Sequence, residues 1–136
     1  MADLKITAGP FQFGANFVAA APKTVAAFRG KLPFVSQLLH VRWSGEAVWM
    51  PLADLEFGVG AENATSYPAP GQILLYPGGV SETEILMAYG PCRFASKAGQ
   101  LAGNHFLTIE GDLAQLAELG RLTLWLGVQP IRFEAS

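Results

Sequence analysis

Charged and aromatic side chains that could form a ligand site occur in three parts of the sequence. Arginine suits such a site because its planar guanidinium pairs bidentately with a carboxylate. Glutamate accepts hydrogen bonds from amides and amines, while tryptophan and tyrosine supply apolar surface. The candidate ligand-binding residues are Arg42, Glu46, Trp49, Glu84, Tyr89, Arg93, Lys97 and His105. Together they predict a site for a small molecule that carries a carboxylate or an amide.

Two neighbouring glutamates could do acid–base chemistry. Glu82 and Glu84 lie two positions apart, so they would share one face of a strand. If both were buried close together, they could exchange protons with a substrate. The favoured interpretation is an exposed strand edge, where charges discourage pairing with other strands.

Other catalytic chemistry has little support in the sequence. The two histidines and the single cysteine, Cys92, lack the local spacing of a zinc site. Arg93 is the one neighbour of Cys92 that we expect to lower its pKa, and only slightly. No nucleophile elbow or phosphate-binding loop occurs. We therefore expect no metal and no cofactor, and the sequence assigns no catalytic residue.

The composition excludes several classes of partner. Hydrophobic residues make up 51% of the chain and charged residues 15%, with a net charge of −2. Nucleic acid is an unsuitable partner because there is no basic patch or run. The longest apolar run is far shorter than the about 18–20 residues that cross a bilayer, and the start lacks signal-peptide features. We expect no membrane partner, a cytoplasmic location and, because the mean hydropathy is +0.29, a homo-oligomer.

Short apolar segments separated by glycine and proline predict a single domain over residues 1–136. Helices are expected to begin at Pro22, which suits a first turn, and after Asp112, which suits an N-cap. The predicted strands are 4–7, 11–17, 36–43, 47–52, 72–76, 85–89, 104–109 and 129–133. This order lacks the alternation of a doubly wound sheet. It predicts a mainly β fold, a closed or nearly closed antiparallel barrel with two helices.

Alternation along the predicted strand 36–43 sorts its side chains between two faces. Leu39, Val41 and Trp43 would share one face, and we expect Trp43 in the core. His40 and Arg42 would share the other face, for which solvent exposure is the favoured interpretation.

The second helix and two connecting segments also carry expectations. We expect Gly120 to interrupt the helix. Residues 53–70 form a predicted loop whose length favours a role in function or assembly. Residues 90–103 are expected to be irregular. The predicted apolar side of the helix comprises Leu113, Leu116, Ala117 and Leu124.

Three segments, in order along the chain, resemble cyclophilins. They are Pro22-Lys23-Thr24 with Ala27-Phe28, His40-Val41-Arg42, and Leu101-Ala102-Gly103-Asn104-His105-Phe106. The resemblance implies a barrel of the cyclophilin-like type and a peptidyl-prolyl isomerase groove. In that groove Arg42 would donate to the imide nitrogen and His105 would line the wall. Ile85, Met87 or Tyr89 would supply the apolar floor.

The chain departs from the cyclophilin pattern at several positions of that groove. One residue separates His40 from Arg42, and Met50 or Trp49 stands near the place of the family's glutamine. Gln100 stands roughly where an aromatic residue is expected. These departures weaken the implied isomerase activity.

A closer resemblance is to a bacterial family of unknown function with a cyclophilin-like fold. It is carried by residues 42–49 (Arg-Trp-Ser-Gly-Glu-Ala-Val-Trp), 70–79 and 93–99. This resemblance implies the fold and no reaction. The leading hypothesis is a small molecule or peptide bound in a groove on the barrel. The alternatives are a prolyl isomerase, and an enzyme acting on a small amide or acid through Glu46 or Glu84.

Overall fold

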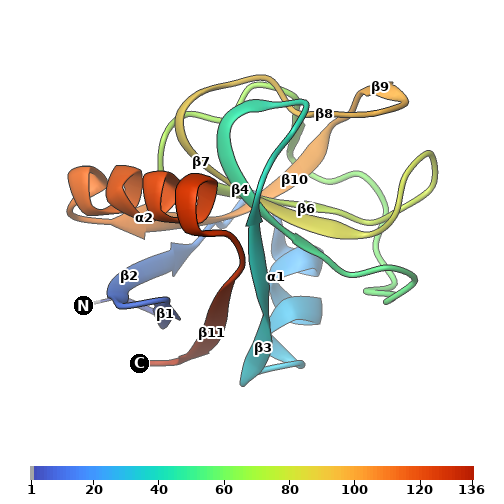
Figure 1. The fold of residues 1–136 in the computed structure, drawn as a ribbon. Coiled ribbons are helices and arrows are strands. Elements are labelled where there is room, and N and C mark those ends of the chain that lie inside the picture. The colour runs from blue at the N-terminus through green and yellow to red at the C-terminus, as the bar shows by residue number, and fades with distance from the viewer. Residues whose placement is uncertain (1) are drawn as a thin grey trace.

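The computed structural model describes residues 2–136, and their main sheet closes into an antiparallel barrel (Figure 1). The barrel strands are β1 (Leu4–Ala8), β2 (Phe11–Phe17), β3 (Phe34–His40), β4 (Gly45–Pro51), β6 (Gln72–Tyr76), β7 (Glu84–Cys92), β10 (Gly103–Glu110) and β11 (Gln129–Ala135). They run in the order β2-β1-β11-β3-β4-β7-β6-β10, and β10 pairs back onto β2. The predicted mainly β barrel with two helices is confirmed.

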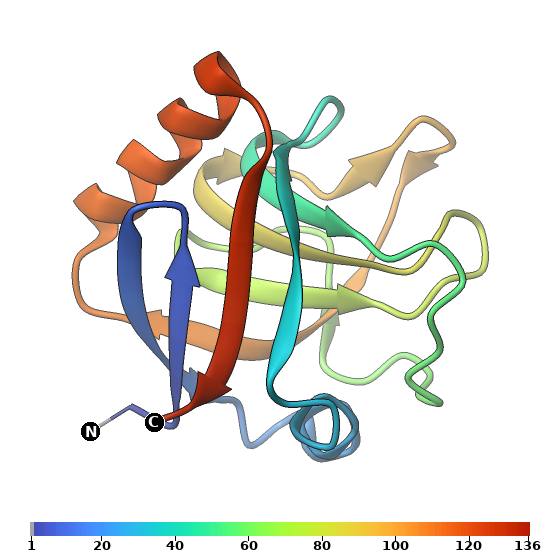
Figure 2. The same ribbon diagram turned by 60° about the horizontal axis from the view of Figure 1, so that its bottom comes forward.

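Barrel closure brings the two ends of the chain together. Strand β1 pairs with β2 on one side and with β11 on the other, with Leu4 opposite Ala135. The termini therefore lie side by side (Figure 2). Three two-residue strands lie outside the barrel proper: β5 (Ala64–Thr65) pairs with β10, and β8 (Ala95–Ser96) pairs with β9 (Gly99–Gln100).

Helix α1 (Pro22–Arg29) supplies the central aromatic side chain of the core. Proline at the first turn costs no hydrogen bond, as the sequence predicted. Phe28 is fully buried. Its ring centroid lies 5.1 Å from those of Phe106 and Phe133 in edge-on contacts and 5.3 Å from that of Phe34. Aromatic pairs in this range stabilise a core beyond the area that they bury.

A buried amide holds the long loop against this helix. The side chain of Asn104, on β10, donates to Thr24 Oγ1 and Gly60 O and accepts from the Glu62 amide. The Glu62 carboxylate in turn accepts from the amides of Lys23 and Thr24, the first turn of α1. These contacts satisfy helix N–H groups that have no partner within the helix. They give the predicted loop a defined path.

Helix α2 (Leu113–Leu126) begins at the predicted cap, where Asp112 accepts from the amides of Ala114 and Gln115. The predicted interruption at Gly120 is wrong, since the helix continues to Leu126. A Cβ atom at Gly120 would overlap the Tyr89 ring. The missing side chain therefore lets the helix approach β7 closely.

The predicted apolar side of α2 is right for Leu116, which is buried, and wrong for Leu113 and Leu124. The helix packs through its Gly120 face, so Leu113 and Leu124 are 43% and 53% exposed. The buried residues are Leu116, Leu119, Gly120 and Thr123.

Large apolar side chains are exposed near the end of α2. Trp125 and Leu126 are 79% and 74% exposed, and Val128 follows at 51%. This surface agrees with the apolar composition, and the homo-oligomer expected from it remains a prediction. Within residues 2–136, no helix is long and apolar enough to cross a membrane.

The strand predicted at 36–43 ends at His40, and residues 41–44 turn toward β4. The Val41 amide donates to Ala47 O, which closes this turn. Trp43 is 54% exposed, so its predicted place in the core is wrong. Alternation cannot bury a side chain beyond the end of its strand.

A second apolar cluster lies on the outer face of β4, β6 and β7. Their inner side chains, such as Met50, Ile73 and Ile85, belong to the main core. The alternate side chains form an outer cluster comprising Ala47, Leu74, Tyr76, Leu86, Phe94 and Leu101. Phe94 and Leu101 come from the segment 90–103, which was expected to be irregular, although residues 90–92 belong to β7 and Gly103 to β10. The segment contains the β8–β9 hairpin and covers this face.

The close contact at Gly120 gives a test of α2 packing. G120A adds a methyl group that helix propensity favours by about 0.8–1 kcal/mol. Overpacking against the Tyr89 ring costs about 1–3 kcal/mol and should dominate. We expect a lower urea midpoint. G60A is the control, because a Cβ there has no neighbour within 4 Å. A G120A protein more stable than the parent would contradict this packing.

Candidate functional site

A pocket of about 170 Å³ opens on the outer side of the barrel, between the 41–44 turn, the 77–83 loop and the β8–β9 hairpin. It combines tryptophans, cations and carboxylates on a small surface. Its lining residues are Val41, Arg42, Trp43, Ser44, Trp49, Ser81, Glu82, Glu84, Ala95, Ser96 and Lys97. The chemistry-bearing side chains come from several separate segments, so folding alone brings them together.

Strand alternation places Glu84 and Trp49 on this side. Glu84 and Leu86 lie two positions apart on β7, and Leu86 belongs to the outer cluster. Trp49 on β4 is the register partner of Leu86 and packs on the same cluster. Glu84 therefore sits at the edge of an apolar cluster and not at a solvated strand edge.

The turn at 41–44 forms one wall and is tied to the covering segment. Ser44 Oγ donates to Ala95 O and accepts from the Ala95 amide, both at 3.0 Å. The Arg93 amide donates to Ser44 O at 2.9 Å. These bonds fix the turn, which places Arg42 and Trp43 on the pocket rim. The Arg42 guanidinium lies over the Trp43 ring, 5.7 Å from its centroid.

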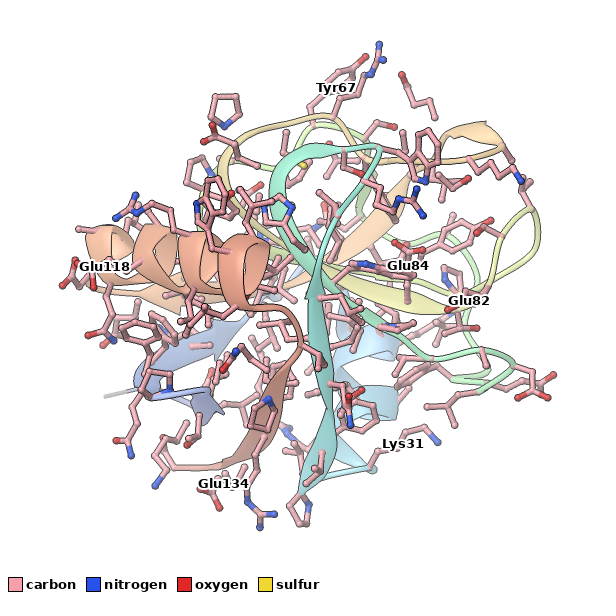
Figure 3. All side chains as sticks on the ribbon, viewed as in Figure 1. Lys31, Tyr67, Glu82, Glu84, Glu118 and Glu134 are labelled. Carbon is pink, nitrogen blue, oxygen red and sulfur yellow. The ribbon has the colours of Figure 1, made fainter. Side chains whose placement is uncertain are left out.

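A buried tyrosine shapes the opposite wall. Tyr76 Oη accepts from the amides of Val80 and Ser81 at 2.9 and 3.3 Å, which orders the 77–83 loop. Ser81 and Glu82 of this loop reach the pocket. Figure 3 shows Glu82 and Glu84 on the side of the barrel away from α2.

The carboxyl of Glu84 is unusual because the side chain is only 6% exposed. Burial, and to a smaller extent the charge of Glu82, raise the pKa of Glu84 to about 7. The ion pairs among residues 2–136 join Glu134 to Lys5 and Arg132, so neither Arg42 nor Lys97 neutralises Glu84. The pocket thus holds a buried carboxyl at one side and exposed cations at its rim.

The structure brings four of the eight predicted residues to this pocket: Arg42, Trp49, Glu84 and Lys97. Sequence reasoning did not assign Trp43, Ser44, Ser81 or Ser96 to a site. Ser44-Gly45, a turn-forming pair, directly follows Arg42 and Trp43 in the sequence, and this pair is a signal that both side chains leave the strand face. The favoured interpretation of Glu84 as part of an exposed edge is wrong, because the outer cluster buries it.

Glu46 and Tyr89 lie apart from this pocket, toward α2. His40 Nδ1 lies 2.9 Å from Val41 O and donates to it, because a carbonyl oxygen can only accept, and Nε2 forms a hydrogen bond with Tyr89 Oη at 2.7 Å. Burial, followed by the charge of Glu46, raises the pKa of Tyr89. The favoured solvated position of His40 is therefore wrong, since it is half-buried in a hydrogen-bonded pair.

His105 and Arg93 also lie outside the lining of the pocket. His105 Nε2 lies 2.8 Å from Thr108 Oγ1 on the same strand, and burial lowers the pKa of His105. Ile85 and Met87 are fully buried in the main core. They do not form the open apolar floor that the cyclophilin resemblance implied, and His105 does not face Arg42 across this pocket.

Cys92 does not line the pocket. Burial raises the pKa of Cys92 to about 11, so the expected lowering by Arg93 is wrong. A thiol with this pKa is a poor nucleophile near neutral pH. Among residues 2–136, no group of three or more histidine, cysteine, aspartate or glutamate side chains could hold a metal ion.

Comparison with known proteins gives a family and a fold. The profile of a family described as "Protein of unknown function (DUF3830)" matches residues 5–135. No curated protein matches the chain. A solved structure titled "Structure of McbB in complex with tryptophan" is similar, with a TM-score of 0.77 and 18% identity. The match covers 98% of this chain and 44% of the McbB chain, so this chain spans less than half of that protein.

The raised pKa of Glu84 predicts a pH-dependent stability. Between pH 4.5 and about 7 the folded carboxyl keeps a proton that the unfolded chain releases, so stability falls as pH rises through this window. At about 1.4 kcal/mol for each pKa unit the loss reaches about 3 kcal/mol. E84Q mimics the protonated acid and should unfold at higher urea than the parent at pH 8, with little difference at pH 4.5.

Urea titrations from pH 4.5 to 8 measure this effect, and E82Q, at an exposed neighbour, is the matched control. E82Q should keep most of the parent's pH slope. Equal stability of E84Q and parent at pH 8 would show that Glu84 is not destabilised by burial.

The two hydrogen bonds of the Ser44 hydroxyl are expected to stabilise the pocket wall. S44A leaves the Ala95 amide and carbonyl without their partner, which costs about 1–3 kcal/mol. S96A, at a partly exposed position next to Ala95, should lower the free energy of unfolding by less. Chemical denaturation compares the two variants, and an unchanged midpoint for S44A would mean that the turn is held by other contacts.

Proposed function

The chain belongs to the DUF3830 family of proteins of unknown function, and we propose that it binds a small molecule in the pocket beside Glu84. The observation that carries this proposal is the buried carboxyl without a cationic partner among the described residues. Burying an uncompensated carboxyl destabilises a fold. Perturbed ionisable groups in a pocket are characteristic of functional sites.

The size and lining of the pocket favour a ligand of metabolite size. Sites for drug-sized ligands enclose about 300–1,000 Å³, whereas this pocket measures about 170 Å³. Trp43 and Trp49 offer apolar contact, and Arg42 and Lys97 suit a carboxylate. The structure of McbB, part of which is similar to this chain, is of a complex with tryptophan, an amino acid, and this supports a small molecule over an extended peptide.

A second candidate function is an enzyme acting on a small amide or acid. The specific observation is that Glu84 has a pKa of about 7, near the value at which a general acid or base works best at neutral pH. Its carboxyl lies in the same pocket as cations that could hold a substrate carboxylate. Binding and catalysis would therefore share one site.

Ligand binding can be tested by a metabolite screen that follows both thermal shift and tryptophan fluorescence. A true ligand should raise the melting temperature with increasing concentration and change the emission of Trp43 or Trp49. R42A should weaken binding at least about fivefold, because an ion pair at the rim is lost. R93A is the matched control, an exposed arginine outside the pocket. If R42A and R93A affect binding equally, the ligand lies elsewhere.

A further inference from the structure

The two sides of the pocket differ in charge, and from this we infer that its ligand is amphoteric. The ligand would present a basic nitrogen to Glu84 and an anionic group to Arg42 and Lys97. This inference rests on the proposed function and names the chemical class of the ligand.

The acidic side of the pocket, formed by Glu82 and Glu84, favours a ligand group with N–H donors. An ionised carboxylate can only accept hydrogen bonds, and Glu84, 6% exposed as a residue, lines the pocket, so its carboxyl oxygens face the pocket space. Glu82 lines the same pocket and adds a second negative charge. An ammonium group of the ligand would satisfy both hydrogen bonding and charge at this side, whereas a ligand carboxylate placed there would be repelled.

The basic side of the pocket, formed by Arg42 and Lys97, favours an anionic ligand group. Arg42 and Lys97 come from separate segments, the 41–44 turn and the β8–β9 hairpin, and both line the pocket. Neither forms an ion pair within residues 2–136. The Arg42 guanidinium lies over the Trp43 ring, 5.7 Å from its centroid, and a guanidinium in such a contact can still donate through its N–H groups to a carboxylate.

The hydroxyl groups of the pocket are compatible with this assignment. Ser44 already donates to and accepts from Ala95, so it has little capacity left. Ser96 Oγ accepts from the Ala98 amide, and its O–H remains a donor for a ligand anion. Trp49 and Val41 add apolar surface to the same pocket. An amino acid with an apolar side chain has this pattern of groups.

Charge-matched probes test the inference. One set comprises phenylalanine, 2-phenylethylamine and 3-phenylpropionate, and a smaller set comprises leucine, isoamylamine and 4-methylpentanoate. Binding is measured by calorimetry at pH 8, where Glu84 is ionised. In at least one set we expect the amino acid to bind about tenfold more tightly than either singly charged probe, because both charged sides are then occupied.

Three variants test which side of the pocket binds each charged group of the ligand. E84Q should weaken the binding of the amino acid and of the amine about tenfold. It should leave the binding of the acid unchanged or make it tighter. R42A should weaken the binding of the amino acid and of the acid, with little effect on the binding of the amine. R93A should change none of them.

The outcomes separate this inference from the proposed function. If the metabolite screen finds a pocket ligand that lacks one of the two charges, or if E84Q does not discriminate amine from acid, the amphoteric assignment is overturned and the binding function stands. If neither the screen nor any probe binds, both are overturned.

Discussion

The alternation of side chains along β4, β6 and β7 is the constraint on which the rest of the structure depends. Each strand carries apolar residues on both faces, one set inside the barrel and one set outside. The register is fixed by pairs such as Leu75 with Ile85 and Leu74 with Leu86. A slip of one residue would exchange the two sets and would carry Glu84 into the barrel interior. The location of the site thus follows from the pairing of the sheet.

The filled interior explains why the pocket lies outside the barrel. Phe28 of α1 and the aromatic rings around it occupy the core, and Leu116 and Leu119 of α2 add to it. A barrel of eight strands is just wide enough for side chains to fill. The segments that connect strands therefore build the site, and they are held by specific hydrogen bonds at Ser44 and Tyr76. Such segments can change their chemistry without disturbing the barrel.

The barrel could be predicted from sequence because its strands and turns have local signals. Apolar alternation marked the strands, Pro22 and Asp112 marked the helix starts, and both marks agree with the structure. The outer cluster could not be predicted, because its partners, such as Leu86 and Phe94, are distant in sequence and meet only after the sheet forms. The burial of Glu84 depends on that cluster, and the buried side of α2 depends on one close contact at Gly120. Four of the eight candidate residues line the pocket. Arg42, Glu84 and Lys97 lie just after or at the start of a strand, whereas Trp49 lies within β4.

Above about pH 7, where the Glu84 carboxyl is ionised, a purely structural role would require a partner that compensates its charge. Buried carboxylates in stable folds are paired or hydrogen-bonded, since an uncompensated charge is costly. Lys97 and Arg42 line the same pocket and could have supplied that partner, yet each remains outside ion-pair distance among the described residues. An apolar residue at this position would extend the outer cluster and stabilise the fold. The presence in one small pocket of opposite charges that are unpaired within residues 2–136 is therefore explained by a ligand that contacts both the Glu84 carboxyl and the cations.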